Sequence, residues 1–183
     1  MKKSFITIVA ILLFLAGSKG SAMANTSNAS AQLQPEITTE AKNDHRVKIL
    51  EGYLNEYNSP LATHARSFIE SADKYDLDWK LLVSIAGLES SYGKHIPQNS
   101  HNGWGWGYNN GSVKHFENWD AAIEEISKGL RENYLFDNKE SDPYIIGPKY
   151  AASPTWAQRV TYFMNKIEDH KIKNAKSTLK VTI

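Results

Sequence analysis

Apolar residues recur at helical spacing in the first half of the chain, which predicts two amphipathic helices. The stronger pattern follows Ser59 and Pro60, which suit the N-cap and the first position of a helix. Its apolar residues share one face at i, i+4, i+7, i+11 and i+14, and they are Leu61, Ala65, Phe68, Ala72 and Tyr75. A shorter helix before it is indicated by Val47, Leu50, Tyr53 and Leu54.

The second half of the chain contains two more apolar stretches with a helical period. The first follows Asn118 or its neighbour as N-cap and carries Trp119, Ala122, Ile123, Ile126, Leu130 and Tyr134. The second starts at Ser153 and Pro154 and carries Trp156, Val160, Phe163, Met164 and Ile167. Between them, residues 136–148 end in Gly147-Pro148, and we expect them to form a loop. The Lys-rich residues from His170 onward are expected to fray.

The pattern of residues 79–93 predicts a fifth helix, between the first two helices and the last two. Asp76 or Asp78 would be its cap, and it would end at Gly93. At about 100° per residue, one face collects Leu81, Tyr92, Ile85, Glu89, Leu82 and Ala86. Glu89 is the only acid of the run, and it falls inside the apolar arc. An apolar setting raises the pKa of a carboxyl group toward the range that a general acid needs. Glu89 is therefore a candidate proton donor; the alternative is a structural carboxylate bonded to backbone N–H groups or to Tyr150.

A β-hairpin is predicted directly after this helix. Residues 104–108 and 112–116 are rich in aromatic and β-branched residues, and they flank Asn109-Asn110-Gly111, which favours a tight turn. The predicted fold class is therefore mainly α (α+β), with four or five helices and one small hairpin. We expect the hairpin to form the floor of a cleft whose walls are helices.

The N-terminus is typical of a secretory signal peptide. Lys2 and Lys3 precede an apolar stretch over residues 5–16, and Ala22-Met23-Ala24 matches a cleavage site; an uncleaved membrane anchor is the alternative. The expected parts of the chain are a signal peptide (1–24), a flexible polar leader (25–44), one domain (45–170) and a basic tail (171–183). We expect the mature protein to be secreted or held in the cell envelope, without stable insertion into a membrane.

The composition of the chain limits the chemistry that it can carry out. Without the three lysines of the signal peptide, 18 Lys and Arg residues stand against 20 Asp and Glu residues, and we expect no nucleic-acid partner. Cysteine is absent, which excludes disulfides and thiolate chemistry. His95, His101 and His115 match no metal-binding spacing, so we expect no metal and no other cofactor. Five Trp and nine Tyr residues supply aromatic faces that can stack on sugar rings.

Four segments stand in a fixed order along residues 59–168. They are SIAGLESSYG at 84–93, NGWGWG at 102–107, FENWDAAI at 116–123 and YAA at 150–152 ahead of Trp156. Together they resemble the lysozyme-like superfamily, most closely its bacterial lytic transglycosylase and glucosaminidase branches, which cut peptidoglycan. The resemblance implies a lysozyme-like helical domain in which Glu89 is the catalytic acid, Tyr150 lies near it and residues 102–108 line the sugar cleft. Residues 105–108 match the usual segment of neither branch, which leaves open the bond that is cut.

The expected function is that of a secreted peptidoglycan-cleaving glycosidase, either a lytic transglycosylase or muramidase-like, which acts on glycan strands. Glu89 would be its general acid and base, Tyr150 would position Glu89, and Glu117 or Asp120 would be the candidate for a second carboxylate. The alternatives are an endo-β-N-acetylglucosaminidase and a non-catalytic cell-wall glycan-binding module on the same fold. The predicted substrate-binding residues are Ser90, Tyr92, Asn102, Trp104, Trp106 and Tyr108. Each also has a structural interpretation: a cap for Ser90, a turn for Asn102 and core packing for the aromatic residues.

Overall fold

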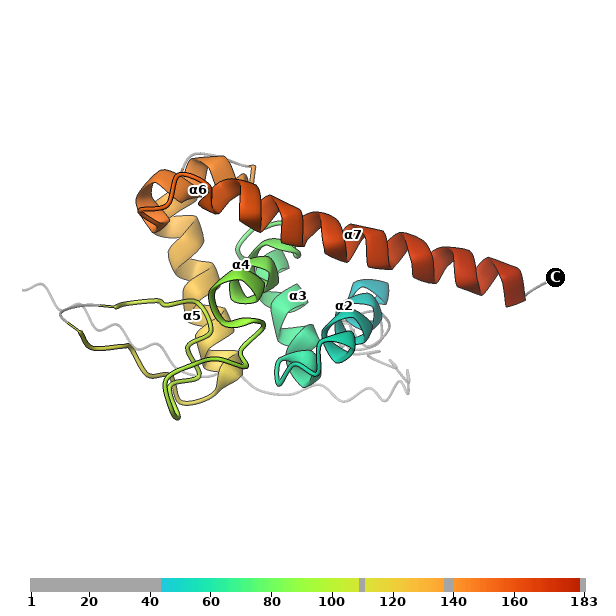
Figure 1. Ribbon diagram of the computed structural model, residues 1–183, viewed down its shortest axis with the longest axis horizontal. Helices are drawn as coiled ribbons and strands as arrows, with labels where there is room; N and C mark the ends of the chain where they lie inside the picture. The colour runs from blue at the N-terminus through green and yellow to red at the C-terminus, as the bar shows by residue number, and fades with distance from the viewer. Residues whose placement is uncertain (1–43, 109–110, 137–139, 182–183) are drawn as a thin grey trace, which may run out of the picture. The chain divides into compact units, whose positions relative to one another are not determined.

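The described residues fold mainly into helices, which confirms the predicted helical class (Figure 1). The computed structural model describes residues 44–108, 111–136 and 140–181, with side chains as far as residue 176, and all of them belong to the compact unit spanning 36–183. In chain order the elements are α2 (His45–Glu56), the 3₁₀-helix η2 (Ala62–His64), α3 (Ala65–Lys74), α4 (Leu81–Ser90), α5 (Trp119–Leu130), the π-helix η3 (Arg131–Leu135), α6 (Pro143–Tyr150) and α7 (Trp156–Val181).

Helix α4 lies at the centre of this arrangement and packs against α7 (Figure 1). Its buried residues are Leu81, Leu82, Val83, Ser84, Ile85, Ala86, Gly87 and Ser90. The sequence pattern predicted one apolar and one polar face, and this is wrong because a helix of almost uniformly apolar or small residues is buried all round. Only Leu88 and Glu89, in its last turn, reach the surface. The position of α4 therefore brings one acidic side chain out of the core.

Ser59 and Asp78, predicted as N-caps, make local hydrogen bonds, but the helices begin after them and have no side-chain cap. The Ser59 hydroxyl accepts a hydrogen bond from the Leu61 amide at 3.0 Å and donates one to the Tyr92 carbonyl at 2.8 Å. The chain then forms the 3₁₀ turn η2 before α3 begins, so the α-helix starts later than Pro60. Ahead of α4, the Asp78 carboxylate accepts from the Lys80 amide at 2.9 Å.

Helix α5 begins where the sequence predicts, and helix α6 replaces a predicted loop. The Asn118 side chain accepts from the Ala121 amide at 2.8 Å, which confirms it as the N-cap of α5. The loop expected at 136–148 is wrong, because Asp142 caps α6 and Pro143 occupies its first turn. Gly147-Pro148 lies inside α6 and does not end it. Asp142-Pro143 is the start signal that could have revealed this helix.

The expected hairpin is not shown. Asn109 and Asn110, its predicted turn, lie outside the described residues, as do the predicted signal peptide and nearly all of the leader. In the described flanks, residues 104–108 and 111–116 form turns and irregular backbone, with one isolated bridge at Ser112. The expected fraying after His170 is wrong, since α7 continues to Val181 and its last turns extend past the other described helices (Figure 1).

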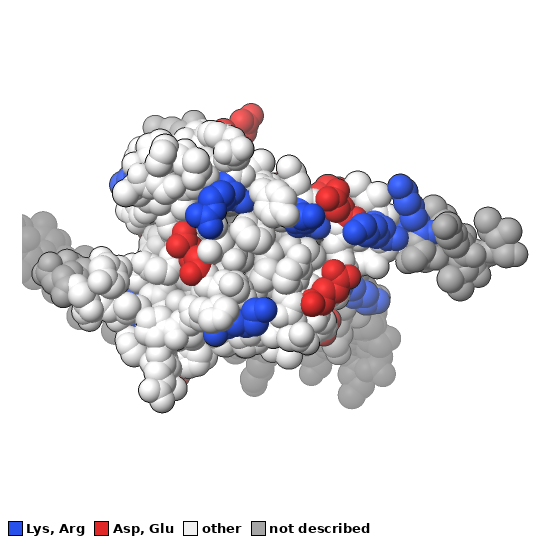
Figure 2. All heavy atoms as spheres, in the orientation of Figure 1, with Lys and Arg blue, Asp and Glu red and all other residues white. Residues whose placement is uncertain are grey.

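The described surface carries both signs of charge. On the face shown in Figure 2, Lys and Arg side chains are interspersed with Asp and Glu side chains, without a continuous patch of either sign. Among residues 44–181, as far as they are described, no helix is both long and apolar enough to cross a membrane.

Candidate functional site

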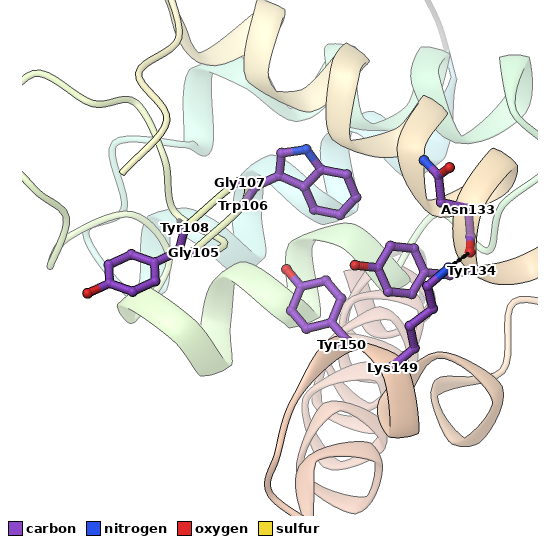
Figure 3. A pocket seen from close by; sticks show the side chains of 8 residues that line it. All are labelled: Gly105, Trp106, Gly107, Tyr108, Asn133, Tyr134, Lys149 and Tyr150. Atoms are coloured by element: carbon purple, nitrogen blue, oxygen red, sulfur yellow. Dashed lines mark hydrogen bonds between the residues drawn. The ribbon is translucent and has the colours of Figure 1, made fainter. Parts of the chain in front are cut away.

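A cavity of about 580 Å³ opens between the 105–108 segment, η3 and α6 (Figure 3). Its lining residues are Gly105, Trp106, Gly107, Tyr108, Asn133, Tyr134, Lys149 and Tyr150. The rings of Trp106, Tyr134 and Tyr150 contact one another with centroids 5.7–6.2 Å apart, and we call these three residues the aromatic cluster. A concave site with aromatic walls and a few polar groups suits a sugar, whose ring faces are apolar and whose edge is polar.

The buried amide of Asn102 fixes the backbone that carries Trp106. Its Nδ2 donates to the carbonyls of Trp106 at 2.8 Å and Lys114 at 2.9 Å. Its Oδ1 accepts from the amides of Trp104 at 3.3 Å and Trp106 at 3.0 Å. With both ends of the amide used inside the protein, Asn102 holds the backbone that carries Trp106, and its contact with substrate stays a prediction.

Helix α5 supplies the surface on which Trp106 rests. A Cβ atom added to Gly129 would lie within 2.9 Å of Cη2 of the Trp106 indole, with another ring atom closer still. The indole therefore lies directly against the helix backbone, and only glycine leaves room for it. This contact sets the depth of the cavity beside the aromatic cluster.

Two aromatic residues predicted to stack on sugar belong to the core instead. Trp104 is 1% exposed, its Nε1 donates to the Leu82 carbonyl at 2.9 Å, and its ring packs beside Phe68. Tyr92 is 2% exposed and its hydroxyl lies 2.6 Å from that of Tyr53. Tyr92 follows the end of α4 with a positive φ of 61°, which turns its ring back against the helix.

Ser90 joins the end of α4 to the segment that follows it. Its buried hydroxyl lies 2.8 Å from the Gly103 carbonyl and 3.0 Å from the Ala86 carbonyl, and it accepts from the Gly93 amide at 2.8 Å. These hydrogen bonds support the structural interpretation of Ser90 as a capping residue, and its contact with substrate stays a prediction.

Glu89 lies at the surface in the last turn of α4, so the prediction that it is buried among apolar side chains is wrong. Its Oε1 accepts a hydrogen bond of 2.8 Å from Nε1 of Trp156, the first residue of α7. This partner differs from the backbone N–H groups or Tyr150 expected for a structural carboxylate. The Trp156 indole in turn stacks on Tyr150, with centroids 4.8 Å apart and planes inclined by 26°. The Glu89 carboxylate is thus linked to the cavity wall through the rings of Trp156 and Tyr150.

Tyr150 connects α6 to the 105–108 side of the cavity (Figure 3). Its hydroxyl donates to the Trp104 carbonyl at 2.8 Å. Burial raises the pKa of the Tyr150 phenol well above its ordinary value, and the negative charge of Glu89 adds to this effect. The phenol therefore stays protonated at any pH at which the protein works and holds the Trp104 backbone in place.

Neither candidate for a second carboxylate lines the cavity. Asp120, in the first turn of α5, bonds to Ser67 and His64 and so ties α5 to the α3 side of the fold. Burial alone would raise the pKa of Asp120, but the hydrogen bonds from Ser67 and His64 outweigh it and lower that pKa. Glu117 is exposed. Within the part of the chain that the structure describes, no three His, Asp or Glu side chains are grouped so that they could hold a metal ion.

Three of the predicted site residues line the cavity, and three lining side chains were missed. Trp106 and Tyr108 were predicted to bind substrate and Tyr150 to lie beside the acid; Tyr108 is 66% exposed. The missed residues are Asn133, Tyr134 and Lys149. The helical pattern places Tyr134 on an apolar face, and Lys149 directly follows the predicted loop 136–148, within α6.

Comparison with known proteins gives two similar sequences. No protein-family model matches the chain. Proteins from two strains of Streptococcus pneumoniae, both named "Putative endo-beta-N-acetylglucosaminidase", are each 28% identical to it over 127 residues, or 63% of this chain. The chain spans about a fifth of the length of these relatives, 19% and 18% respectively.

Proposed function

We propose that the chain is a glycosidase that cleaves the glycan strands of peptidoglycan, in the manner of an endo-β-N-acetylglucosaminidase, with Glu89 as its proton donor. The observation that carries the proposal is the exposed Glu89 carboxylate, held by Trp156 beside an aromatic cavity. The names of the two streptococcal relatives support the same class of reaction. The order of the sequence motifs supports a lysozyme-like fold with a small hairpin around the unassigned Asn109-Asn110 turn.

The hydrogen bond from Trp156 leaves one carboxyl oxygen of Glu89 for chemistry. Because Oε1 accepts the indole N–H, Oε2 would carry the proton to the glycosidic oxygen as the bond to the leaving sugar breaks. No carboxylate is among the residues that line the cavity, so the nucleophile would come from the substrate. If its 2-acetamido oxygen bonds to C1 as the leaving sugar departs, Glu89 then deprotonates a water that attacks C1 and displaces the acetamido oxygen, which gives hydrolysis. If its 6-hydroxyl attacks C1 instead, Glu89 takes the hydroxyl proton and a 1,6-anhydro product forms.

The walls of the cavity would hold the sugars through stacking. Trp106 and Tyr134, whose rings contact each other, and the exposed Tyr108, which lies apart from them, would offer ring faces along the wall (Figure 3). Stacking on aromatic faces tolerates the repeating sugars of a polymer, since each pyranose has an apolar face.

Mass spectrometry of digested cell-wall sacculi tests the proposal. We expect soluble fragments with reducing N-acetylglucosamine ends. Reducing muramic acid ends would assign a muramidase, and 1,6-anhydro ends a lytic transglycosylase. The absence of any released fragment, with sacculi that a known glycosidase digests, would contradict an enzymatic role.

A non-catalytic glycan-binding module is the second candidate, and one observation favours it. The residues that line the cavity include no acid, and Glu89 itself is not among them. This candidate predicts that the protein is retained on insoluble sacculi without turnover, and that Trp106→Ala weakens the retention.

The predicted signal peptide supports a place outside the cytoplasm, where peptidoglycan lies. N-terminal sequencing of the protein recovered from the envelope or the medium tests it, with a start near Asn25 as the expected result.

A further inference from the structure

Lys149 is the charged side chain of the cavity. It lies on α6, its Nζ donates to the Asn133 carbonyl at 2.6 Å, and it stands 5.0 Å from the centroid of the Tyr134 ring (Figure 3). The other lining residues are glycine, aromatic or amide residues, and none is an acid. The cation is therefore fixed in position at the wall of the cavity by a carbonyl and a ring.

Lys149 has no salt bridge to an aspartate or glutamate of the described residues. Five lysines elsewhere in the described fold do have one: Lys74, Lys80, Lys114, Lys128 and Lys171. What sets Lys149 apart from the remaining lysines is its place in the lining of the cavity. An ammonium group has three N–H donors, of which the Asn133 carbonyl uses one, so two remain for a ligand.

We propose that Lys149 selects substrates that carry a carboxylate next to the sugar bound in the cavity, an inference that rests on the proposed glycan-cleaving function. A carboxylate that replaces water at the exposed ammonium gains charge-assisted hydrogen bonds. Peptidoglycan offers two sources of this group: the lactyl carboxylate of muramic acid after its peptide is removed, and the carboxylates of the stem peptide.

The test measures binding of short glycan strands by the change in tryptophan fluorescence, in a Glu89→Gln background that prevents turnover. Three ligands separate the sources of charge: peptide-free strands, the same strands with every lactyl carboxylate converted to its methylamide, and strands that keep their stem peptides. Lys149→Met removes the charge, Lys149→Arg keeps it, and Lys173→Met is the matched control on exposed α7 surface.

We expect the parent protein of this comparison, the Glu89→Gln variant with Lys149 intact, to bind a carboxylate-bearing strand about tenfold more tightly than the methylamide strand. Lys149→Met should remove most of this preference, while Lys149→Arg and Lys173→Met should keep it. A preference confined to strands with stem peptides would identify the peptide as the source.

Equal binding of charged and neutral strands by the parent, or an undiminished preference in Lys149→Met, would overturn the role of Lys149. In that outcome glycan binding itself persists, so the proposed function is unaffected. Failure to bind any of the three strands would count against both the proposed function and this inference.

Discussion

At the scale of single residues, the site depends on side chains that hold others in place. Asn102 bonds four backbone groups of the cavity wall, and Ser90 joins the end of α4 to Gly103. Neither side chain lines the cavity, so each would influence a bound ligand only by holding the backbone near Trp106 in place. Trp156 has the corresponding role for Glu89, because its indole N–H fixes one carboxylate oxygen.

Trp156→Phe tests this positioning role. The phenyl ring can still stack on Tyr150 but loses the hydrogen bond to Glu89, so glycan-cleaving activity should fall about tenfold. The smaller ring at this buried position should also lower the free energy of unfolding by about 1–3 kcal/mol. Rates of fragment release from sacculi and urea denaturation measure the two effects. Trp79→Phe, at a partly buried tryptophan on another part of the fold, is the control. Full activity in Trp156→Phe would show that the indole does not position the acid.

Gly129→Ala tests the packing of Trp106 on α5. Alanine favours a helix over glycine by about 1 kcal/mol, but the added methyl group would overlap the indole, and overpacking costs about 1–3 kcal/mol. We therefore expect lower stability and weaker glycan binding, measured by urea denaturation and fluorescence titration.

Gly52→Ala is the matched control for this substitution, because its nearest neighbour would be a His170 ring atom at 3.4 Å. Here the gain in helix propensity should raise stability slightly. If Gly129→Ala stabilises the protein as much as Gly52→Ala does, the indole is free to move and does not define the cavity.

For single aromatic residues, the sequence does not predict whether the ring packs in the core or faces the cavity. Core packing and sugar stacking use the same side chains, and the choice depends on neighbours that are distant in sequence. Trp104 is buried because its indole reaches the Leu82 carbonyl, and Tyr92 because its hydroxyl meets that of Tyr53. Trp106, two residues from Trp104, faces the cavity because Gly129 admits its ring.

At the scale of elements, ion pairs and hydrogen bonds join α5 to α3. Glu124 accepts hydrogen bonds from Lys74, Tyr75 and Ser71, and Asp120 bonds to Ser67 one turn earlier along α5. The hydrogen bond from Lys74, with support from Tyr75, lowers the pKa of Glu124 below its ordinary value. These contacts stabilise the helix pair that lies beneath Trp106.

The lowered pKa of Glu124 predicts a loss of stability in acid. Since the folded-state value lies below the unfolded one, the contribution is complete at neutral pH and disappears as the pH falls from about 5 through the folded value. The side chain is 41% exposed, so water screens the interaction and we expect about 1 kcal/mol or less.

Glu124→Gln should therefore lower stability at pH 7 and make the decline between about pH 5 and 3 shallower. Urea denaturation across this range measures it, with Glu117→Gln as the exposed control. An unchanged acid slope in Glu124→Gln would mean that the contacts of Glu124 contribute nothing to folding.

Most helices could be predicted because their start signals are local. Asn118 caps α5 and Asp78 precedes α4 as the sequence indicates. Helix α6 was not predicted, because Gly147-Pro148 is typical of a loop and Asp142-Pro143 is the weaker signal of a helix start. A proline near the end of a short helix does not prevent its first turn from forming. The exposure of Glu89 could not be predicted, because a helical wheel assumes a solvent face and α4 is enclosed on all sides but its last turn.

At the scale of the whole molecule, the chain corresponds to about a fifth of each streptococcal relative. The proposed glycan cleavage therefore depends on the site itself. There the Glu89 carboxylate, linked to the cavity wall through Trp156 and Tyr150, is the group that we propose carries the proton.

Replacing Glu89 by glutamine tests this claim most directly, because the amide keeps the size of the side chain and its bond from Trp156 but cannot donate a carboxyl proton. Release of soluble fragments from sacculi should fall at least about 100-fold, with an unchanged urea denaturation midpoint. Glu51→Gln, at an exposed position of α2, should retain the parent activity. Fragment release by Glu89→Gln at the parent rate would contradict the account.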